Sequence, residues 1–334
     1  MSNKQLTNSG ASKWGVIRVK YRTELAMGII MVAFFIMMCF LTENFRTAQN
    51  LSNVGSQVAI IAILSIGQTF VMLTGGIDLS VGAILGLSSM SMAMSMVATQ
   101  SIGIGIIVGL LMGLGVGALN GFLISYMRIP AFITTLGMQM IARGADYLIS
   151  NGRSVSNLVS GFEQIAKLEI VPYVRVYYIA IIALFIVMAW CLNNTKLGRY
   201  IYAIGSNANA ARLAGVNVKR FTLYPYVISG LMAAVGAILM SSRLMGVDAT
   251  YGANYEMDTL AAVVIGGTAM TGGKGTLVGT AIGVVFMGLV KNGLDLLGVS
   301  PYWQTVTVGI IIIAALLIES ISTMVREKKK ATVA

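Results

Sequence analysis

The sequence predicts an all-α polytopic membrane protein with about ten transmembrane helices (roughly eight to ten) and with both termini in the cytoplasm. The chain has 334 residues, of which 57% are hydrophobic and only 10% are charged. A single water-soluble core does not remove so much apolar surface from water. In addition, apolar runs of membrane-spanning length alternate with short polar segments, and the basic residues are distributed unevenly among those segments.

Apolar windows indicate about ten candidate spans, each with a boundary error of a few residues. They cover residues 25–42, 54–74, 79–98, 101–127, 131–149, 175–192, 221–241, 259–270, 276–291 and 302–320. The eighth is shorter than the roughly 20 residues that a perpendicular crossing needs, which indicates a broken helix or a misplaced boundary. Eight or nine spans with a re-entrant segment are the alternative.

The first span follows a basic, acid-free leader. Residues 1–23 contain five basic side chains and no acidic one, and the apolar run from Leu25 to Leu41 comes next. The following Thr42-Glu43-Asn44-Phe45 has no small-x-small cleavage pattern, so we interpret the run as an uncleaved span rather than a signal peptide.

The basic residues predict the orientation of the spans. With the N-terminus inside, the cytoplasmic segments hold 16 of the 23 basic residues. The outer segments and outer span ends hold the other seven, which are Arg46, Arg143, Arg153, Lys167, Arg175, Arg243 and Lys291. Because Lys and Arg are retained on the cytoplasmic side, both termini are predicted to lie inside.

This orientation predicts a simple domain organisation. The cytoplasmic tails are residues 1–23 and 321–334, and residues 24–320 form a single transmembrane domain. The domain has a long cytoplasmic loop at 193–220 and outer loops at 150–174 and 242–258.

The residue inventory excludes several classes of chemistry. The chain contains no histidine, which removes the commonest general base, proton shuttle and metal ligand. Cys39 and Cys191 both lie inside apolar runs, so neither a disulfide framework nor a thiolate metal site is expected. The 22 methionines are scattered, which favours core packing over metal transport. We therefore predict no catalytic residue and no metal ligand.

A nucleotide-binding motif is also absent from the sequence. Walker A requires a glycine five residues before its Gly-Lys pair and Ser or Thr after it. Around Lys274 these positions are occupied by Thr268 and Gly275. The chain is therefore not predicted to be an enzyme or to hydrolyse ATP alone.

Glycines recur at every fourth position in two of the spans. They are Gly105, Gly109, Gly113, Gly117 and Gly121 in one span, and Gly275, Gly279 and Gly283 in another. Such spacing allows another helix to approach closely. We interpret both series as helix packing within the subunit, with no functional role assigned.

Residues 193–220 form a long polar segment between two apolar runs. The segment carries Lys196, Arg199, Arg212, Lys219 and Arg220 without any acidic residue. Charge of this sign predicts a cytoplasmic location. Its length is sufficient to bind a partner protein.

The segment from Gly75 to Gly86 turns abruptly and then becomes apolar again. Asp78 lies just before the new run, where its carboxylate is suited to accept hydrogen bonds from unpaired helix amides. A capping role is the first interpretation of Asp78, and a functional role of an intramembrane acid is the alternative.

Four groups of motifs together resemble one family of membrane proteins. They are Thr74-Gly75-Gly76-Ile77-Asp78-Leu79-Ser80 continued to Gly86; Glu256-Met257-Asp258 with 261–268, 272–275 and Gly279-Thr280; Asn292-Gly293-Leu294 with 297–304; and, in the long loop, 197–200, 203–207 and 210–216. These motifs resemble the permease subunits of ATP-binding-cassette (ABC) importers for ribose, galactose, xylose, arabinose and related small molecules. Ribose-type permeases resemble the chain most, although its Met- and Ser-rich residues 87–100 depart from that subgroup.

The resemblance implies the transmembrane permease subunit of an ATP-driven, binding-protein-dependent importer of a monosaccharide such as ribose. Its implied partners are a cytoplasmic ABC ATPase, an extracytoplasmic sugar-binding protein on the two outer loops, and a second permease copy or related chain, but no nucleic acid. The chain itself would carry no cofactor, since ATP and Mg belong to the ATPase. The implied location is the plasma membrane of a prokaryote, which is the inner membrane of a Gram-negative cell.

The resemblance also implies roles for particular residues. The ATPase-coupling loop would include Arg199, Gly205, Ser206, Asn207, Ala211, Arg212 and Gly215. The resemblance implies a structural or gating role for Gly75, Gly76 and Asp78.

A sugar that crosses hydrocarbon must exchange its hydrogen bonds to water for hydrogen bonds to protein. Uncharged polar side chains within the spans are therefore candidates for a translocation pathway, with structural interhelix hydrogen bonds as the alternative. The candidates are Gln68, Ser88, Ser91, Ser95, Asn120, Gln139 and Gln304.

Two other functions compete with this interpretation. An ion-coupled secondary transporter usually places ionisable groups at mid-membrane, whereas here Asp78 and Asp295 lie near span ends. A passive channel for small polar solutes fits the glycine-rich helices but gives the acid-free loop no role.

Overall fold

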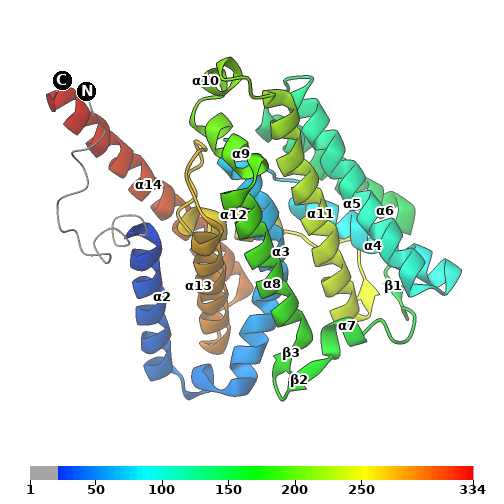
Figure 1. Ribbon diagram of the computed structural model, residues 1–334. Coiled ribbons are helices and arrows are strands. Elements are labelled where there is room, and N and C mark those ends of the chain that lie inside the picture. Colours follow the sequence, from blue (N-terminus) through cyan, green and yellow to red (C-terminus); the bar gives the residue numbers. More distant parts are fainter. Residues whose placement is uncertain (1–21, 334) are drawn as a thin grey trace.

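The computed structural model describes residues 22–333, which form an all-α bundle (Figure 1). The long helices are α2 (Arg22–Leu41), α3 (Ala48–Leu73), α4 (Val81–Thr99), α5 (Ile102–Ser125), α6 (Ala131–Ser150), α8 (Val176–Asn194), α11 (Val218–Leu244), α13 (Leu277–Leu296) and α14 (Pro301–Val333). A shorter helix, α12 (Tyr255–Ile265), lies among them. The predicted N-terminal tail lies outside the described residues, apart from its last two.

Every predicted span has a helix at its position. Among the described residues, seven helices are long and apolar enough to cross a membrane: α2, α3, α4, α5, α8, α11 and α13. An apolar helical stretch also covers residues 301–317 of α14. The prediction of an all-α membrane protein is confirmed, whereas about ten crossings and the orientation of the termini stay predictions.

Short elements lie at opposite ends of the bundle (Figure 1). One end, which we call the α10 end, carries α9 (Lys196–Ser206) and α10 (Ala208–Leu213). The other, which we call the strand end, carries η1 (Glu43–Arg46), α7 (Gln164–Lys167), β1 (Val155–Ser156), β2 (Glu169–Val171), β3 (Val174–Arg175) and β4 (Gly246–Val247). β1 pairs with β4 and β2 pairs with β3, both antiparallel.

The centre of the bundle is α3, which is buried from Val58 to Leu73. It contacts α11, α12 and α13. A helix that is surrounded by other helices needs no polar face, which fits the mostly apolar sequence of α3. The two predicted outer loops and the long polar loop extend from the ends of this helical core.

The glycine series in α5 faces its neighbouring helices. A Cβ atom at Gly113 would lie 2.4 Å from the carbonyl oxygen of Gly230 in α11, and one at Gly117 would lie 2.5 Å from that of Tyr226. A Cβ at Gly109 would lie 3.0 Å from Met92 in α4. Close helix packing within the subunit, as predicted, is confirmed.

Helix α12 ends after 11 residues because Gly266 and Gly267 follow it. Gly267 has a φ of +85°, which favours glycine and terminates the helix. The chain then runs without regular structure to α13, and Gly279 of α13 packs on Gly266 so closely that a Cβ would lie 2.0 Å from its carbonyl oxygen. The short eighth segment of the sequence is thus a short helix followed by a glycine-rich turn.

Candidate functional site

The long polar loop is folded into two helices rather than extended. Thr195 caps α9 by accepting a hydrogen bond from the Gly198 amide, and Asn207 caps α10 by accepting one from the Ala210 amide at 2.9 Å. Each cap accepts a hydrogen bond from a first-turn amide, which has no partner within its own helix. The caps therefore fix where α9 and α10 begin.

Helix α9 meets the bundle at a glycine junction, formed by Gly75, Gly205, Gly272 and Gly273. A Cβ at Gly205 would lie 1.9 Å from the Leu73 carbonyl oxygen and 2.4 Å from the Gly273 nitrogen. A Cβ at Gly272 would lie 2.7 Å from the nitrogen of Gly75. The backbones of α9, of the turn after α3 and of the turn before α13 therefore touch directly.

A tyrosine side chain reinforces the same junction. The Tyr202 hydroxyl in α9 donates a 2.7 Å hydrogen bond to the carbonyl oxygen of Gly275. Together with the glycine contacts, this bond attaches α9 to both turns. A displacement of α9 would therefore act on backbone at the ends of α3 and α13.

The predicted coupling residues divide into packed and exposed positions. Gly205 is part of the glycine junction, and Ala211 is only 5% exposed. Arg199, Ser206, Asn207, Arg212 and Gly215 are exposed. Leu213, which the sequence analysis did not select, is 88% exposed at the end of α10. The exposed end of this basic segment therefore carries an apolar side chain.

Asp78 lies in the turn between α3 and α4 and is 1% exposed. Its carboxylate accepts hydrogen bonds from the Ser80 amide at 2.9 Å, the Ser80 hydroxyl at 2.5 Å and the Ser229 hydroxyl of α11 at 2.7 Å. Asn120 of α5 in turn donates to the Ser80 hydroxyl at 2.8 Å. Asp78 thus ties the start of α4 to α5 and α11.

The adjoining glycines explain the shape of that turn. Gly75 has a φ of +81°, and a Cβ at Gly76 would lie 2.2 Å from the Tyr226 hydroxyl. Neither position therefore accommodates a side chain without strain.

The candidate pathway residues lie on five different helices. Gln68 is fully buried in α3, where neither of its amide atoms has a hydrogen-bond partner in the described structure. Ser88 and Ser91 are buried in α4, and the Ser95 hydroxyl bonds to its own helix at the Ser91 carbonyl.

The remaining three candidates belong to separate polar groups. Asn120 takes part in the Asp78 group, Gln139 donates to Glu256 at 2.9 Å, and Gln304 donates to Asp295 at 2.6 Å. The last of these contacts lies beside a cavity.

The two predicted outer loops form one surface at the strand end. Val155 of β1 pairs with Val247 of β4, and the Ser154 hydroxyl donates a 2.7 Å hydrogen bond to Asp248. Hydrogen bonds from Ser154 and Thr250 lower the pKa of the Asp248 carboxyl below its ordinary value of 3.8. The two loops, far apart in sequence, are therefore joined.

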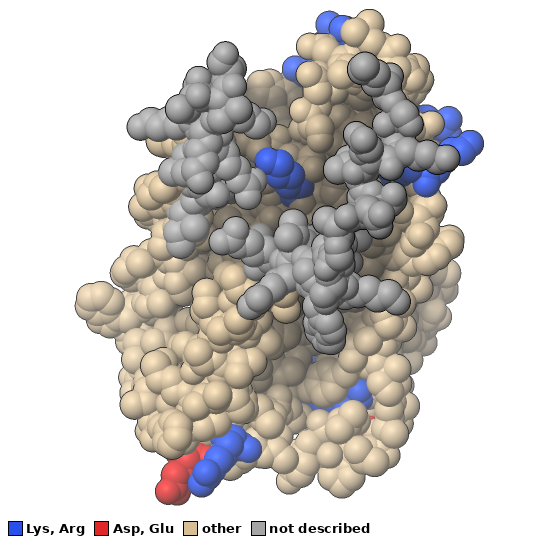
Figure 2. All heavy atoms as spheres, turned by 60° about the vertical axis from the view of Figure 1, so that its left-hand side comes forward, with Lys and Arg blue, Asp and Glu red and all other residues tan. Residues whose placement is uncertain are grey.

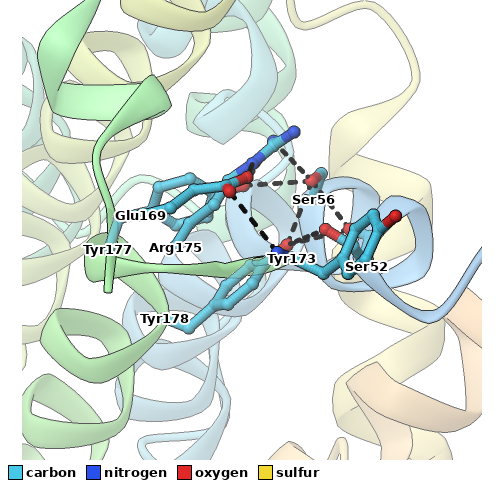
Figure 3. A network of polar contacts seen from close by, with 7 residues as sticks. All are labelled: Ser52, Ser56, Glu169, Tyr173, Arg175, Tyr177 and Tyr178. Carbon is cyan, nitrogen blue, oxygen red and sulfur yellow. Dashed lines mark hydrogen bonds and ion pairs between the residues drawn. The ribbon is translucent and has the colours of Figure 1, made fainter. Parts of the chain in front are cut away.

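A polar network that the sequence analysis did not select links β3 to α3 (Figure 3). Arg175 donates to the Ser56 hydroxyl at 2.8 Å and to the Tyr177 hydroxyl at 3.1 Å. Tyr177 donates to Ser56 at 3.1 Å, while Tyr178 donates to the Ser52 carbonyl at 2.8 Å. Ser56 is the centre of this network, which holds the β2–β3 hairpin on the central helix.

These features define a polytopic helical membrane protein with an exposed helical contact at one end and a joined loop surface at the other. Among the described residues, no group of three or more Cys, Asp or Glu side chains is placed to hold a metal ion.

Comparison with known proteins identifies the family. The profile described as "Branched-chain amino acid transport system / permease component" matches residues 50–316, so the chain belongs to that permease family. The ribose import permease of Escherichia coli K12 is 38% identical over 289 residues, covering 84% of this chain and 88% of its own. The Bacillus subtilis ribose import permease is 39% identical over 286 residues, covering 85% and 88%.

A relative with a different substrate in its name is also similar. The fructose import permease of Rhizobium meliloti is 36% identical over 289 residues, covering 83% of this chain and 79% of its own. No solved structure matches the chain. The expected resemblance to sugar-type import permeases is confirmed by these relatives.

Proposed function

We propose that this chain is the membrane-spanning permease subunit of an ATP-driven, binding-protein-dependent monosaccharide importer, with ribose as the first candidate substrate. The observation that carries the proposal is the α9–α10 unit, because it combines an exposed apolar tip with a rigid attachment to the central helix. The substrates named for the ribose and fructose import permeases support the sugar class.

The α10 end is proposed to be cytoplasmic and to bind an ABC ATPase through Leu213 and Arg212. ATP and Mg would be held by that partner, since this chain lacks Walker A. Movement of the ATPase would displace α9, and the glycine junction would carry the displacement to the turns after α3 and before α13. The displacement would be transmitted through backbone contacts and would not depend on a flexible side chain.

The strand end is proposed to face outward and to receive a sugar-binding protein. Pairing of β1 with β4 makes the two outer loops a single docking surface, and the Ser56 network connects that surface to α3. Two copies of the permease, or this chain and a related one, would form the passage. The complex would lie in the plasma membrane of a prokaryote, with about ten crossings per chain and both termini inside.

The proposal is tested with the full chain purified in mild detergent together with its native partners. We expect a Walker A ATPase to be retained, and its reconstitution with the binding protein to give ribose uptake that depends on ATP. Leu213→Asp should release the ATPase, because it replaces the apolar tip by a charge. Leu297→Asp is the matched control, since Leu297 is 48% exposed at the opposite end of the bundle. Ribose uptake by the chain alone without ATP would contradict the proposal in favour of a secondary transporter or channel.

A further inference from the structure

An apolar groove of about 370 Å³ lies on the exposed face of α5, on the side of the bundle away from α2 and α14 (Figure 1). It is lined by Val108, Leu111, Met112, Gly115, Val116 and Leu119. Leu111 is 62% exposed and Leu119 is 47% exposed. Gly115 contributes no side chain, and a Cβ there would meet no atom within 4 Å. The groove therefore faces outward from the bundle.

Two aromatic rings extend this face of α5 toward the α10 end. Phe122 and Tyr126 follow Leu119 at helical spacing, and their rings are stacked with centroids 5.5 Å apart. The Lys219 ammonium nitrogen of α11 lies 5.5 Å from the centroid of the Tyr126 ring, which is within the range of a cation–π contact. The apolar groove therefore leads, over the two rings, to a cation.

The length of this path matches one leaflet of a bilayer. From Gly115 to Tyr126 the helix advances by about 16 Å, because each residue adds about 1.5 Å. One leaflet contributes about 15 Å to a hydrocarbon core that is about 30 Å thick. A phospholipid whose acyl chain lies in the groove would therefore place its phosphate at the level of Lys219.

The cations at the end of this path have no acidic neighbour in the segments that form this face. Arg128, Lys219 and Arg220 are exposed, and neither ion pair in the described part of the chain involves them. Residues 79–145 and 170–247, which contain all of α4, α5, α8, α9, α10 and α11, include no Asp or Glu. Figure 2 shows basic side chains exposed around the α10 end at the top of the view, whereas the visible acidic ones lie near the opposite end. Charge of one sign favours an anionic ligand.

Lys219 keeps the capacity to bind such a ligand. Its ammonium group has three N–H donors, so contact with one ring leaves donors for phosphate oxygens. Helix α11 begins at Val218, and its first amides add partial positive charge beside the ammonium group. A zwitterionic headgroup would bring its own ammonium group close to these cations, which is unfavourable, whereas an anionic headgroup would not.

A second copy of this chain fits the groove less well. In a twofold pair whose axis is normal to the membrane, the same ends of both chains lie at the same depth. The basic α10 end of one copy would then approach the acid-free surface that carries Lys219 in the other. Like charges that meet across an interface are unfavourable, so the groove favours a lipid over a second permease.

We propose that the α5 groove and Lys219 form a binding site for one phospholipid with a net negative headgroup, such as phosphatidylglycerol. An acyl chain fills the groove, and Lys219 and Arg128 bind the headgroup phosphate. The site does not depend on which solute the protein transports. Phe221 lies two residues after Lys219, and its ring contacts that of Tyr200 in α9 with centroids 4.6 Å apart. The bound lipid would thus stabilise the start of α11 beside α9.

The test uses the full chain, stripped of lipid in detergent, and counts bound phospholipid by native mass spectrometry during titration with phosphatidylglycerol or phosphatidylcholine. Lys219→Gln combined with Arg128→Gln removes the two cations. Arg153→Gln combined with Lys167→Gln is the matched control, because both residues are exposed at the strand end and form no ion pair within the described residues.

A second pair of variants tests the groove itself. Gly115→Phe fills the groove without a backbone clash, since a Cβ there would meet no atom within 4 Å. Gly144→Phe in α6 is the matched control, because Gly144 is also an exposed helical glycine whose Cβ would meet no atom within 4 Å. The charge variants and the groove variants are independent, so a variant that fails to fold leaves the other pair decisive.

We expect saturable binding of phosphatidylglycerol, about tenfold or more tighter than that of phosphatidylcholine. The change of Lys219 with Arg128, and Gly115→Phe, should each weaken it about tenfold or more, and neither control should change it. Equal weakening by a variant and its control, or no preference for phosphatidylglycerol, would overturn the site. Competition by glycerol phosphate, which lacks acyl chains, would assign the cations to free phosphate instead. Loss of permease pairing on Gly115→Phe with lipid binding unchanged would assign the groove to a second copy.

Discussion

The backbone amide of Gly273 donates a 2.9 Å hydrogen bond to the carbonyl oxygen of Leu73. Leu73 is the last residue of the central helix α3, and Gly273 lies in the turn before α13. Gly205 of α9 lies against both atoms of this bond. The contact explains why glycine occupies positions 205 and 273, which are far apart in sequence: each backbone must approach the other more closely than a side chain permits.

Gly205→Ala is expected to destabilise this junction. The added methyl group would lie 1.9 Å from the Leu73 carbonyl oxygen, so α9 must move outward, at a cost of about 1–3 kcal/mol. Thermal unfolding in detergent should show a lower midpoint, and ATPase activity should be less tightly coupled to uptake. Gly137→Ala adds the same methyl group where no atom lies within 4 Å. Equal midpoints for the two variants would show that the junction is not tightly packed.

Ser229→Ala is expected to weaken the attachment of α11 to the turn between α3 and α4. The substitution removes the 2.7 Å hydrogen bond to Asp78 and leaves one buried carboxylate oxygen without that donor. The expected loss is about 1–3 kcal/mol in the free energy of unfolding. Ser95→Ala is the control, because the Ser95 hydroxyl bonds only within its own helix in the described structure. An equal effect of both variants would contradict the conclusion that the hydrogen bond from Ser229 to Asp78 holds α11 on this turn.

Much of the fold could be predicted because apolar runs and glycine spacing are local properties of the sequence. Every predicted span has a helix, and the series beginning at Gly105 packs as its spacing indicates. Boundaries were less accurate where tertiary contacts decide them. α3 begins at Ala48, six residues before the predicted start at Val54, because Thr47 caps it and polar Asn50 bonds to Asn292 within the bundle.

The candidate site was less predictable, since exposure and side-chain partners depend on the whole fold. Ala211 and Leu213 are two residues apart in an apolar-basic segment, yet one is buried and the other is exposed. The distribution of basic residues did, however, indicate some of these internal contacts. Four of the seven basic residues predicted to lie outside make internal contacts: Arg143 to Tyr251, Arg175 to Ser56, Arg243 to Ser56 and Lys291 to Asp258.

The pairing of the two outer loops should weaken at acidic pH. The pKa of Asp248 is lowered in the folded protein, chiefly by the hydrogen bond from Ser154. Its contribution is therefore fully present above the ordinary carboxyl value of 3.8 and is lost as the pH falls through the lower folded pKa. Hydrogen exchange of the amides around Val247, corrected for intrinsic rates, should accelerate below that value.

Asp248→Asn provides the control for this pH effect. The asparagine does not titrate, so exchange near Val247 should be faster at neutral pH but should show no further loss of protection on acidification. A variant that kept the same pH dependence as the unmodified chain would assign the effect to another group.

Ser56 and Arg175 are expected to act as one unit, which a double-mutant cycle measures. Ser56→Ala removes the acceptor of Arg175 and of Tyr177, and leaves a partly buried guanidinium without its shortest hydrogen bond. Once Arg175→Met has removed that cation, the same serine change should cost less, giving a coupling of about 0.5–3 kcal/mol in the free energy of unfolding. Pairing Arg175→Met with Ser95→Ala, in a different helix, should instead give additive effects. Additivity in the Ser56 pair would mean that the β2–β3 hairpin is not held on α3 through this contact, and that binding at the strand end must reach the central helix by another route.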